Sequence, residues 1–435
     1  MYHFVGIKGA GMSALASIMK NLGYEVQGSD VDKKFFTDDG LIKNNIKTFV
    51  YNKNNINKDL IIVQGSSIKD NHEEIIKAKE LNLKIIKYHD MIGELSKKYK
   101  TISIAGCHGK TTTTAMLSHV LNNIIGINFF IGDGTGYADK DNEFFALESC
   151  EYQRHFLSYF PYYTIITNID LDHLDYFKDL EDIISAYQEF IDKTSNKVIL
   201  CGDDINTRKL ITKDNCLYYG LNDDNSVIAK DINYKEDGIS FNVYINNNLY
   251  GGFDLPLYGE HQLLDALAVI TICYLENINS IEVDKVFKTF KGAKRRFAET
   301  IIGNNIIIDD YAHHPNEVKS TINSIKQKYP NKKIVAIFQP HTFSRTKNIY
   351  KELCNVLNEV DVSYIFDIHP AREKQEDYPN ITSDIIINNI KNGYHIDDKD
   401  SGDLCKFNNA VFTFMSPNDL SILENDLIEK LKEAN

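Results

Sequence analysis

The chain lacks any apolar run long enough to cross a membrane. No stretch of its 435 residues reaches the roughly 18 consecutive apolar residues that a transmembrane helix needs. The first residues, Met-Tyr-His-Phe-Val-Gly, enter an expected strand directly, without the basic and then apolar segments of a secretory signal. We therefore expect a cytoplasmic protein that has no membrane partner.

The chain has fewer basic than acidic residues, and it has few cysteines. The chain has 48 Lys and Arg against 61 Asp and Glu, a formal net charge of −13, whereas a nucleic-acid-binding surface is basic. We expect no nucleic-acid partner. The seven cysteines are scattered and form no Cys-x-x-Cys pair, which argues against a zinc site and a disulfide framework. The length corresponds to about three domains of roughly 150 residues each.

The most informative stretch is Thr-Ile-Ser-Ile-Ala-Gly-Cys-His-Gly-Lys-Thr-Thr, residues 101–112. Its apolar start predicts a strand over 101–105, and a helix is expected from residue 110. Strand, glycine turn, Lys-Thr and helix is the layout of a phosphate-binding loop. The candidate ATP-binding residues here are Gly106, Cys107, His108, Gly109, Lys110, Thr111 and Thr112.

The chemistry of this stretch suits a nucleotide, although its spacing is short. Backbone N–H groups, the helix N-terminus and Lys110 all attract anions, and the Thr111 hydroxyl can bind Mg²⁺. Gly106 precedes Lys110 by four residues rather than the usual six, so an ordinary strand-to-helix turn is the alternative. Cys107 is interpreted as a small filler residue; the alternative is a thiol activated by the helix N-terminus.

The N-terminal segment predicts a second nucleotide-binding turn. A strand leads into Gly6, Gly9 and Gly11, a helix is expected over about 13–22, and the next strand ends in Asp30, where a ribose-binding acid would lie. Because Lys8 replaces the second glycine of a dinucleotide motif, we prefer a nucleotide-bearing ligand other than NAD. Later in the same region Ser66 and Ser67 follow another strand; they are either ligand contacts or helix N-caps.

Two strands of the central region end in groups that suit a metal–ATP site. The first, over 144–148, ends in Glu148, and the second, over 163–168, leads into a segment that holds Asp170, Asp172, His173 and Asp175. Carboxylates are hard ligands that fit Mg²⁺. The alternatives are a structural role for His173 and a solvated turn for the three aspartates. Alternating short strands are expected over about 216–255.

A basic cluster at 294–296 marks the expected joint to a third region. It is either an anion-binding element or a solvated joint. The expected strands that begin at 306, 333 and 362 each end in polar residues, so their ends could converge on one crevice. The polar residues in question are Asp309, Asp310, Glu317, His341, Arg345, His369 and Arg372. Strand–helix alternation predicts another parallel sheet, closed by a helix over about 420–431.

Six motifs together carry a family resemblance that spans residues 2 to about 417. In chain order they are Gly-Ile-Lys-Gly-Ala-Gly-Met-Ser, Gly-Cys-His-Gly-Lys-Thr-Thr, Thr-Asn-Ile-Asp-Leu-Asp-His, Lys-Arg-Arg-Phe, Asp-Asp-Tyr-Ala-His-His-Pro-Asn-Glu and Gln-Pro-His-Thr-Phe-Ser-Arg-Thr. The chain thereby resembles the Mur ligases of peptidoglycan synthesis, whose phosphate loop is similarly short.

The resemblance implies a three-domain α/β fold. The expected domains are a Rossmann-like UDP-sugar-binding domain over 1–98, a central P-loop ATPase-like domain with a mainly parallel sheet over 99–295, and a doubly wound Rossmann-like domain for the amino acid and part of the ATP site over 296–435. The chain is most similar to the members of the family that join L-alanine to the lactyl carboxylate of UDP-N-acetylmuramate. That reaction passes through an acyl phosphate and releases ADP and phosphate. ATP and Mg²⁺, with Mn²⁺ as the alternative ion, would be required.

The resemblance also implies a role for each candidate residue. Lys110 would hold the β- and γ-phosphates, Thr111 and Glu148 would bind one metal ion, and His173 would help to bind a second. ATP contacts from the third domain would be Arg296, Asp310 and Tyr311. UDP-sugar contacts would be Gly6, Gly9, Gly11, Met12, Ser13, Asp30, Ser66 and Ser67. Alanine contacts would be His313, His341 and Arg345.

Two departures from the family pattern affect the nucleotide and C-terminal loops. His-Gln-Leu-Leu-Asp at 261–265 replaces the usual His-Asn-x-x-Asn near the adenine, and Met-Ser-Pro-Asn at 415–418 replaces Gly-Ala-Gly-Asp. No lysine is predicted to be carbamylated.

Four other functions compete with this interpretation. A Mur ligase that recycles a tripeptide differs only in its pocket. A folate polyglutamate synthetase is disfavoured by the N-terminal glycine turn, and an NAD-dependent oxidoreductase by Lys8 and the second phosphate loop. A non-catalytic nucleotide-binding regulator is disfavoured because Lys110, Thr111, Glu148 and His173 are all present.

Overall fold

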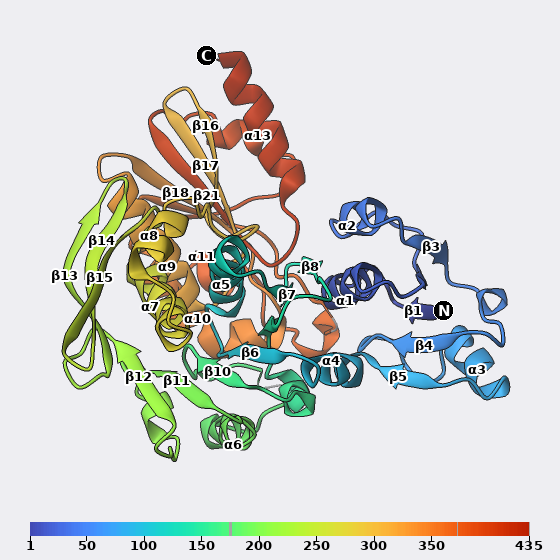
Figure 1. The fold of residues 1–435 in the computed structure, drawn as a ribbon. Coiled ribbons are helices and arrows are strands. Elements are labelled where there is room, and N and C mark those ends of the chain that lie inside the picture. The colour runs from blue at the N-terminus through green and yellow to red at the C-terminus, as the bar shows by residue number, and fades with distance from the viewer. Residues whose placement is uncertain (174–175, 372, 435) are drawn as a thin grey trace. The chain divides into compact units, whose positions relative to one another are not determined.

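The computed structural model describes residues 1–173, 176–371 and 373–434. Asp175 and Arg372, which the sequence places among the polar strand ends, lie outside the described residues. The described chain forms three mainly parallel sheets that alternate with helices along the sequence, which confirms the predicted α/β class (Figure 1).

The first sheet has five parallel strands in a Rossmann-like order, as predicted. In spatial order the strands are β3 (Lys47–Val50), β2 (Val26–Asp30), β1 (Tyr2–Val5), β4 (Ile61–Gln64) and β5 (Ile85–Lys87). The helices of this region are α1 (Ala10–Asn21), α2 (Asp38–Lys43), α3 (Glu73–Glu80) and α4 (Tyr88–Ser96), with the short 3₁₀ turn η1 (Lys53–Asn55).

The second sheet has ten strands and contains the phosphate loop. In spatial order they are β15 (Asn248–Leu255), β14 (Gly238–Ile245), β13 (Val227–Lys235), β12 (Cys216–Gly220), β11 (Lys197–Cys201), β10 (Tyr163–Ile166), β6 (Lys100–Ala105), β9 (Phe144–Glu148), β7 (Asn128–Phe130) and β8 (Gly136–Tyr137). The helical elements are α5 (Lys110–Ile124), α6 (Leu180–Ile191), α7 (Glu260–Leu275), α8 (Ser280–Phe287), η2 (Tyr152–Ser158) and η3 (Thr207–Lys209).

The third sheet has six strands, of which the edge strand β16 is antiparallel to its neighbour. In spatial order they are β16 (Ala298–Ile302), β17 (Asn305–Asp310), β21 (Ala410–Met415), β18 (Lys333–Phe338), β19 (Val362–Ile365) and β20 (Gly393–His395). The helical elements are α9 (Pro315–Lys328), α10 (Phe343–Leu357), α11 (Asp384–Ile387), α12 (Ser401–Leu404), α13 (Ser421–Ala434) and η4 (Gln375–Asp377).

The chain divides into two compact units. One comprises Met1–Asp231, Phe241–Phe253 and Leu264–Phe290, and holds the first sheet and most of the second. The other comprises Ile232–Ser240, Asp254–Leu263 and Lys291–Asn435, and holds the third sheet. The two domain boundaries, after residues 98 and 295, stay a prediction.

The central strands are apolar because helices cover both faces of a parallel sheet. Residues 101–105 of β6 and all of β10 are buried, as expected for strands that have no solvent face. Burying one such side chain contributes roughly 1.5–3 kcal/mol. Polar residues follow directly where these strands end, which places the chemistry at the carboxyl edge of a rigid sheet.

Two local features differ from the sequence-based expectation. The first helix begins at Ala10 rather than near Ser13. The N-cap of α3 is His72, whose ring accepts a hydrogen bond from the Glu74 N–H at 3.3 Å, so the N-cap interpretation of Ser66 and Ser67 is wrong. Within the described part of the chain, no helix is both long and apolar enough to span a membrane.

Candidate active site

The phosphate loop joins β6 to α5 through a tight turn that needs glycine at two positions. Gly106 has φ +139° and Gly109 has φ +81°, which are conformations that residues with a Cβ rarely adopt. A Cβ on Gly106 would lie 2.0 Å from the Thr167 hydroxyl oxygen, so space excludes a side chain as well. The loop therefore brings backbone groups close to whatever occupies it.

The end of β10 holds this loop in shape. The Asn168 side chain makes two bonds to His108: its Oδ1 accepts from the backbone N–H and its Nδ2 donates to the backbone carbonyl, both at 2.9 Å. The Thr167 hydroxyl donates to the same carbonyl at 2.5 Å. Thr167 and Asn168 were not predicted as site residues, although they are the first two residues of the Thr-Asn-Ile-Asp-Leu-Asp-His motif.

Lys110 is held by the loop and by a buried carboxylate. Its ammonium donates to the carbonyl of Gly106 at 2.5 Å and to that of Cys107 at 3.2 Å, and lies 3.0 Å from Glu151 Oε2. Burial disfavours the charged form of Lys110, but Glu151 outweighs burial and raises its pKa above the ordinary value. Lys110 therefore carries a positive charge at the phosphate loop at neutral pH.

Thr111 and Glu148, which are predicted to bind one metal ion, are in contact beside the loop. The Thr111 hydroxyl donates to Glu148 Oε1 at 2.8 Å, and the Gly132 N–H donates to Glu148 Oε2 at 2.6 Å. A hydroxyl and a carboxylate oxygen side by side at a helix N-terminus form the hard donor set that suits Mg²⁺. The residues present thus fit the predicted metal ion.

His173 reaches the same area through Glu151. Its Nε2 lies 3.6 Å from Glu151 Oε1 and 3.9 Å from Asp172 Oδ2, and its ring packs against Tyr152 at 4.9 Å. Its backbone has φ +54°, an uncommon conformation for a residue other than glycine. Glu151 was missed by sequence reasoning; the only signal was a second acid three residues after Glu148.

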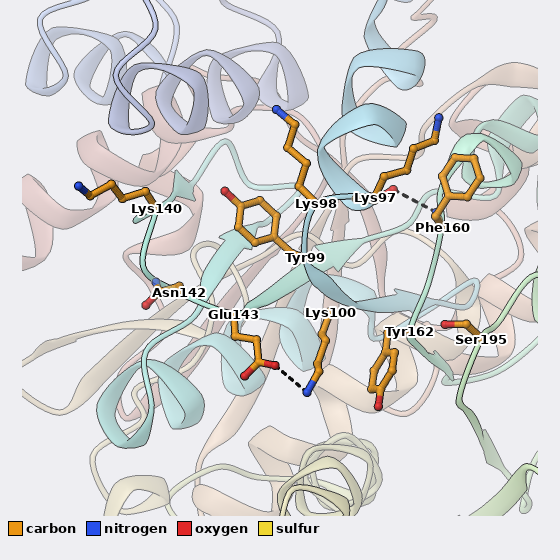
Figure 2. Close-up of a pocket in the computed structure, with 11 residues that line it drawn as sticks. Lys97, Lys98, Tyr99, Lys100, Lys140, Asn142, Glu143, Phe160, Tyr162 and Ser195 are labelled. Atoms are coloured by element: carbon orange, nitrogen blue, oxygen red, sulfur yellow. Dashed lines mark hydrogen bonds and ion pairs between the residues drawn. The ribbon is translucent and has the colours of Figure 1, made fainter.

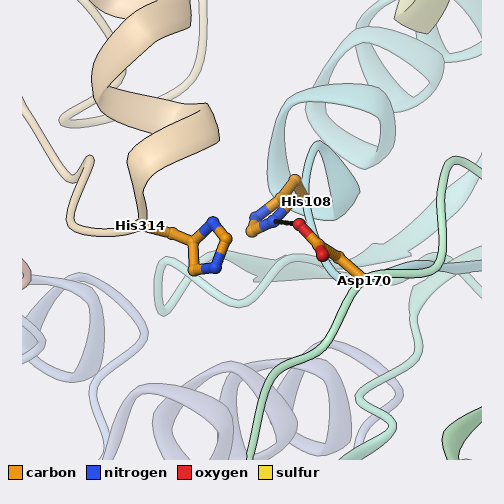
Figure 3. Close-up of side chains that lie close together, drawn as sticks. All are labelled: His108, Asp170 and His314. Atoms are coloured by element: carbon orange, nitrogen blue, oxygen red, sulfur yellow. Dashed lines mark hydrogen bonds and ion pairs between the residues drawn. The ribbon is translucent and has the colours of Figure 1, made fainter. Parts of the chain in front are cut away.

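Cys107 and His108 are both tied to Asp170. The His108 Nε2 lies 3.2 Å from Asp170 Oδ2 (Figure 3), and the Cys107 thiol donates to the Asp170 carbonyl at 3.2 Å. Burial, followed by the Glu151 charge, raises the pKa of Cys107 well above its ordinary value. The alternative of an activated thiol at Cys107 is therefore wrong, and Cys107 is a buried packing residue.

The N-terminal glycine turn is hydrogen-bonded to residues of its own region. Asp30 is buried, and its carboxylate accepts from the N–H groups of Lys8 and Val31 at 2.7 and 2.8 Å. The Lys8 ammonium lies 3.6 Å from Asp38 Oδ1. The remaining predicted contacts differ in exposure. Met12 and Ser13 are buried, whereas Ser66 and Ser67 are exposed just after β4.

In the second unit, the basic cluster at 294–296 is partly structural. Arg295 forms a two-pronged ion pair with Asp309, at 2.9 and 3.2 Å, and donates to the carbonyls of Ser416 and Asn418. The Arg296 guanidinium lies 4.9 Å from the Tyr311 ring centre. Arg295 thus holds the C-terminal loop whose sequence departs from the family pattern.

Asp310 and three histidines gather after the strands of the third sheet. Asp310 is buried and accepts from the N–H groups of Phe297 and Ala312, each at 2.8 Å; burial raises its pKa to about 6. The rings of His313 and His341 are 6.1 Å apart, and His341 stacks on His369 at 5.5 Å. His313 Nδ1 lies 3.1 Å from Glu317, near the start of α9, where His314 is the N-cap residue (Figure 3).

Arg345, the last of the predicted site residues, lies in the first turn of α10, whose N-cap is Thr342.

Three family models match successive parts of the chain. The "Mur ligase family, catalytic domain" model matches residues 1–100, the "Mur ligase middle domain" model matches 104–273, and the "Mur ligase, glutamate ligase domain" model matches 295–402. The chain belongs to the Mur ligase family. Its members are ATP-dependent ligases.

Solved structures of other Mur ligases share the fold over the whole chain. UDP-N-acetylmuramate-alanine ligase MurC from Thermotoga maritima is 25% identical, with a TM-score of 0.83 and coverage of 100% of this chain and 99% of that chain. A murein peptide ligase from Psychrobacter arcticus is 21% identical, with a TM-score of 0.69 and coverage of 99% and 98%. MurF from Thermotoga maritima, solved with ADP, is 17% identical, with a TM-score of 0.66 and coverage of 97% and 99%.

One departure of this Mur ligase from the family pattern lies directly on the phosphate loop. Asp265 is buried and accepts a hydrogen bond from the Thr113 hydroxyl at 2.9 Å. A Cβ on Gly109 would lie 2.8 Å from the same carboxylate. The Asp265 carboxylate thus stabilises the start of α5 through its hydrogen bond with Thr113.

Proposed function

We propose that this Mur ligase joins L-alanine to the lactyl carboxylate of UDP-N-acetylmuramate, with conversion of ATP to ADP and phosphate, in peptidoglycan synthesis in the cytoplasm. The observation that carries the proposal is the contact between the Thr111 hydroxyl and the Glu148 carboxylate beside Lys110. This set of groups suits phosphoryl transfer from a metal-bound nucleotide. The likeness to MurC over the full chain supports the substrate assignment.

The chain's own residues neutralise and position the transferring phosphate. Lys110 holds the β- and γ-phosphates, and the N–H groups of the loop contact the phosphate oxygens. Thr111 and Glu148 would hold one Mg²⁺, and His173 would help to hold a second. Bound Mg²⁺ supplies charge neutralisation on the phosphate oxygens. Glu151 positions Lys110 and His173 by contact with both.

The proposed reaction has two steps. A lactyl carboxylate oxygen attacks the γ-phosphorus, the bond from that phosphorus to ADP breaks, and an acyl phosphate forms. The alanine nitrogen then attacks the acyl carbon, phosphate leaves, and the nitrogen loses a proton as the amide forms. Arg345 is the partner for the alanine carboxylate, with His313 and His341 beside it.

The remaining predicted residues divide between the other two ligands. Arg296, Asp310 and Tyr311 would contact ATP from domain 296–435. The residues at the UDP-sugar end would be Gly6, Gly9, Gly11, Met12, Ser13, Asp30, Ser66 and Ser67. For Met12 and Ser13, which are buried, the contact would come from the backbone at the start of α1.

The test is phosphate release with ATP, UDP-N-acetylmuramate and single amino acids. We expect release with L-alanine, and less with glycine or L-serine. Because one methyl group discriminates by only about 1–3 kcal/mol, the preference should lie within roughly 10- to 200-fold. Release with none of the amino acids or peptides would contradict a catalytic role.

A second candidate has its own support, because the chain also shares its fold with a murein peptide ligase. That enzyme class adds a peptide in place of one amino acid. Phosphate release with L-alanyl-γ-D-glutamyl-diaminopimelate but not with L-alanine would replace our assignment by this one. A comparison at equal concentrations of the two amines decides between them.

A further inference from the structure

A pocket of about 610 Å³ lies at the amino ends of four strands of the central sheet (Figure 2). Its lining comes from the segments that precede β6, β9, β10 and β11, which run parallel to one another. The phosphate loop follows the carboxyl end of β6 and so lies at the opposite edge of the sheet. None of the candidate active-site residues lines this pocket.

The pocket concentrates positive charge in an acidic protein. Four lysines, Lys97, Lys98, Lys100 and Lys140, and one acid, Glu143, line it, which leaves three positive charges in excess. Glu143 pairs with Lys100 at 2.7 Å (Figure 2). Among the residues that the structure describes, no carboxylate forms an ion pair with Lys98 or Lys140. The chain as a whole carries −13, so this local excess favours an anionic ligand.

An exposed aromatic ring lies at the edge of the same pocket. Phe160 is 45% exposed, and the ammonium groups of Lys97 and Lys193 lie 4.5 and 5.0 Å from its ring centre. Burial, followed by the charge of Lys97, lowers the pKa of Lys193. Two like charges are thus held beside one ring, an arrangement that an anion would relieve. Tyr99 and Tyr162 add further ring surface to the lining.

The composition of the lining narrows the class of ligand. It contains lysines but no arginine, so a bound anion would be held by point charges, as the lysine of a phosphate loop holds phosphate, rather than by bidentate pairing. The volume falls within the roughly 300–1,000 Å³ of small-molecule sites. Exposed rings beside a cationic cluster can stack on a planar base.

We propose that this pocket is a second nucleotide site, which binds a nucleoside di- or triphosphate with its pyrophosphate group on Lys98 and Lys140 and its base against Phe160. The site is separate from the phosphate loop and uses none of its residues. Both ends of β6 would then contact phosphate, one for catalysis and one for binding alone.

The test uses the full-length Lys110→Ala protein, in which the phosphate loop is weakened, and isothermal titration with inorganic pyrophosphate and with ADP. We expect both to bind, and ADP to bind more tightly because only ADP carries a base. Adding Lys98→Ala and Lys140→Ala should weaken both at least tenfold. Adding instead Lys58→Ala and Lys391→Ala, at two exposed lysines elsewhere that form no ion pair within the described residues, should change neither affinity.

Phe160→Leu separates the base from the phosphate. It should bring the affinity for ADP down to that for pyrophosphate and leave pyrophosphate binding unchanged. Unchanged affinities in the Lys98→Ala, Lys140→Ala protein would overturn the site, and equal affinities for ADP and pyrophosphate before Phe160 is changed would overturn the nucleotide assignment. Melting temperatures measured without ligand verify that each variant is folded.

Discussion

The ammonium of Lys110 lies 3.0 Å from one oxygen of the Glu151 carboxylate, and the His173 imidazole lies 3.6 Å from the other. Glu151 is 1% exposed, so its charge is compensated by these neighbours rather than by water. One buried carboxylate thus positions a phosphate-binding cation and a candidate metal ligand together. Its loss should affect both without removing either.

Glu151→Gln should therefore lower kcat by about 10- to 100-fold, because small displacements of catalytic groups have effects of this size. The KM for UDP-N-acetylmuramate should stay unchanged, since Glu151 does not belong to the proposed sugar site. Steady-state kinetics with each substrate varied in turn measure both. Glu181→Gln, at a well-exposed carboxylate of the same unit, is the matched control. A normal kcat in Glu151→Gln would contradict the positioning role.

Lys110→Ala should remove nearly all turnover and leave sugar-nucleotide binding intact. The lost ammonium is the main fixed positive charge of the loop, and removing a group that stabilises transition-state charge costs about 10²–10³ in rate. Phosphate release measures turnover, and titration with UDP-N-acetylmuramate measures binding. A near-normal kcat would show that the phosphate-loop assignment is wrong.

Thr111→Val should raise the Mg²⁺ concentration needed for half-maximal activity by at least about tenfold. Valine has nearly the shape of threonine but lacks the hydroxyl that contacts Glu148 at 2.8 Å. Thr111→Ser keeps the hydroxyl and should behave as the wild type. The same Mg²⁺ dependence in Thr111→Val as in Thr111→Ser would contradict metal binding at this position.

The phosphate loop could be predicted from the sequence because its signals are local. The apolar run ends at residue 105, and α5 begins at Lys110, as the pattern indicates. Glu148 likewise ends β9. In each case the end of an apolar run, or a change in the hydrophobic periodicity, marks the end of the strand or the start of the helix within a few residues of the functional side chain.

The supporting residues could not be predicted in the same way. Asn168 contacts the backbone of His108 from 60 residues away, and Glu151 contacts Lys110 from 41 residues away. Such contacts depend on β10 and β9 lying on either side of β6, and no local sequence pattern indicates the order of the strands in a sheet. Strand β21 is a similar case: it inserts between β17 and β18, although it begins 100 residues after the end of β17 and 72 residues after the end of β18.

A buried polar network in the N-terminal region predicts a stability effect. Glu74 is fully buried; it accepts from the Ser29 hydroxyl, and from the Asn52 N–H and the Asn55 amide at 3.0 and 2.8 Å. His3 Nε2 lies 3.7 Å away. Burial alone would raise the pKa of Glu74, but these partners together lower it.

Glu74→Gln should destabilise the protein by about 2–3 kcal/mol at pH 7, because buried donors lose a charged acceptor. A lowered carboxyl pKa contributes stability above its ordinary value of 4.5, and this contribution is lost as the pH falls below that value. The difference from the wild type should therefore shrink at acid pH. Urea unfolding at pH 7 and pH 4 measures it, and Glu73→Gln, at the exposed neighbour on α3, should shift stability by less than about 0.5 kcal/mol.

Glu424 on α13 should show the opposite dependence on pH. Burial, followed by the charge of Asp309, raises its pKa from 4.5 to about 7, although Arg295 acts against them. A raised carboxyl pKa means that ionisation opposes folding, so the wild type loses stability from this group as the pH rises from about 4.5 to about 7. Glu424→Gln removes this unfavourable ionisation. Because the side chain is partly exposed and screened, we expect the free energy of unfolding to rise by about 1–2 kcal/mol at pH 8 and not to change near pH 4. Thermal or urea unfolding across this range measures the gain, with the exposed Glu429→Gln on the same helix as control; a gain that grows as the pH falls would contradict the sign.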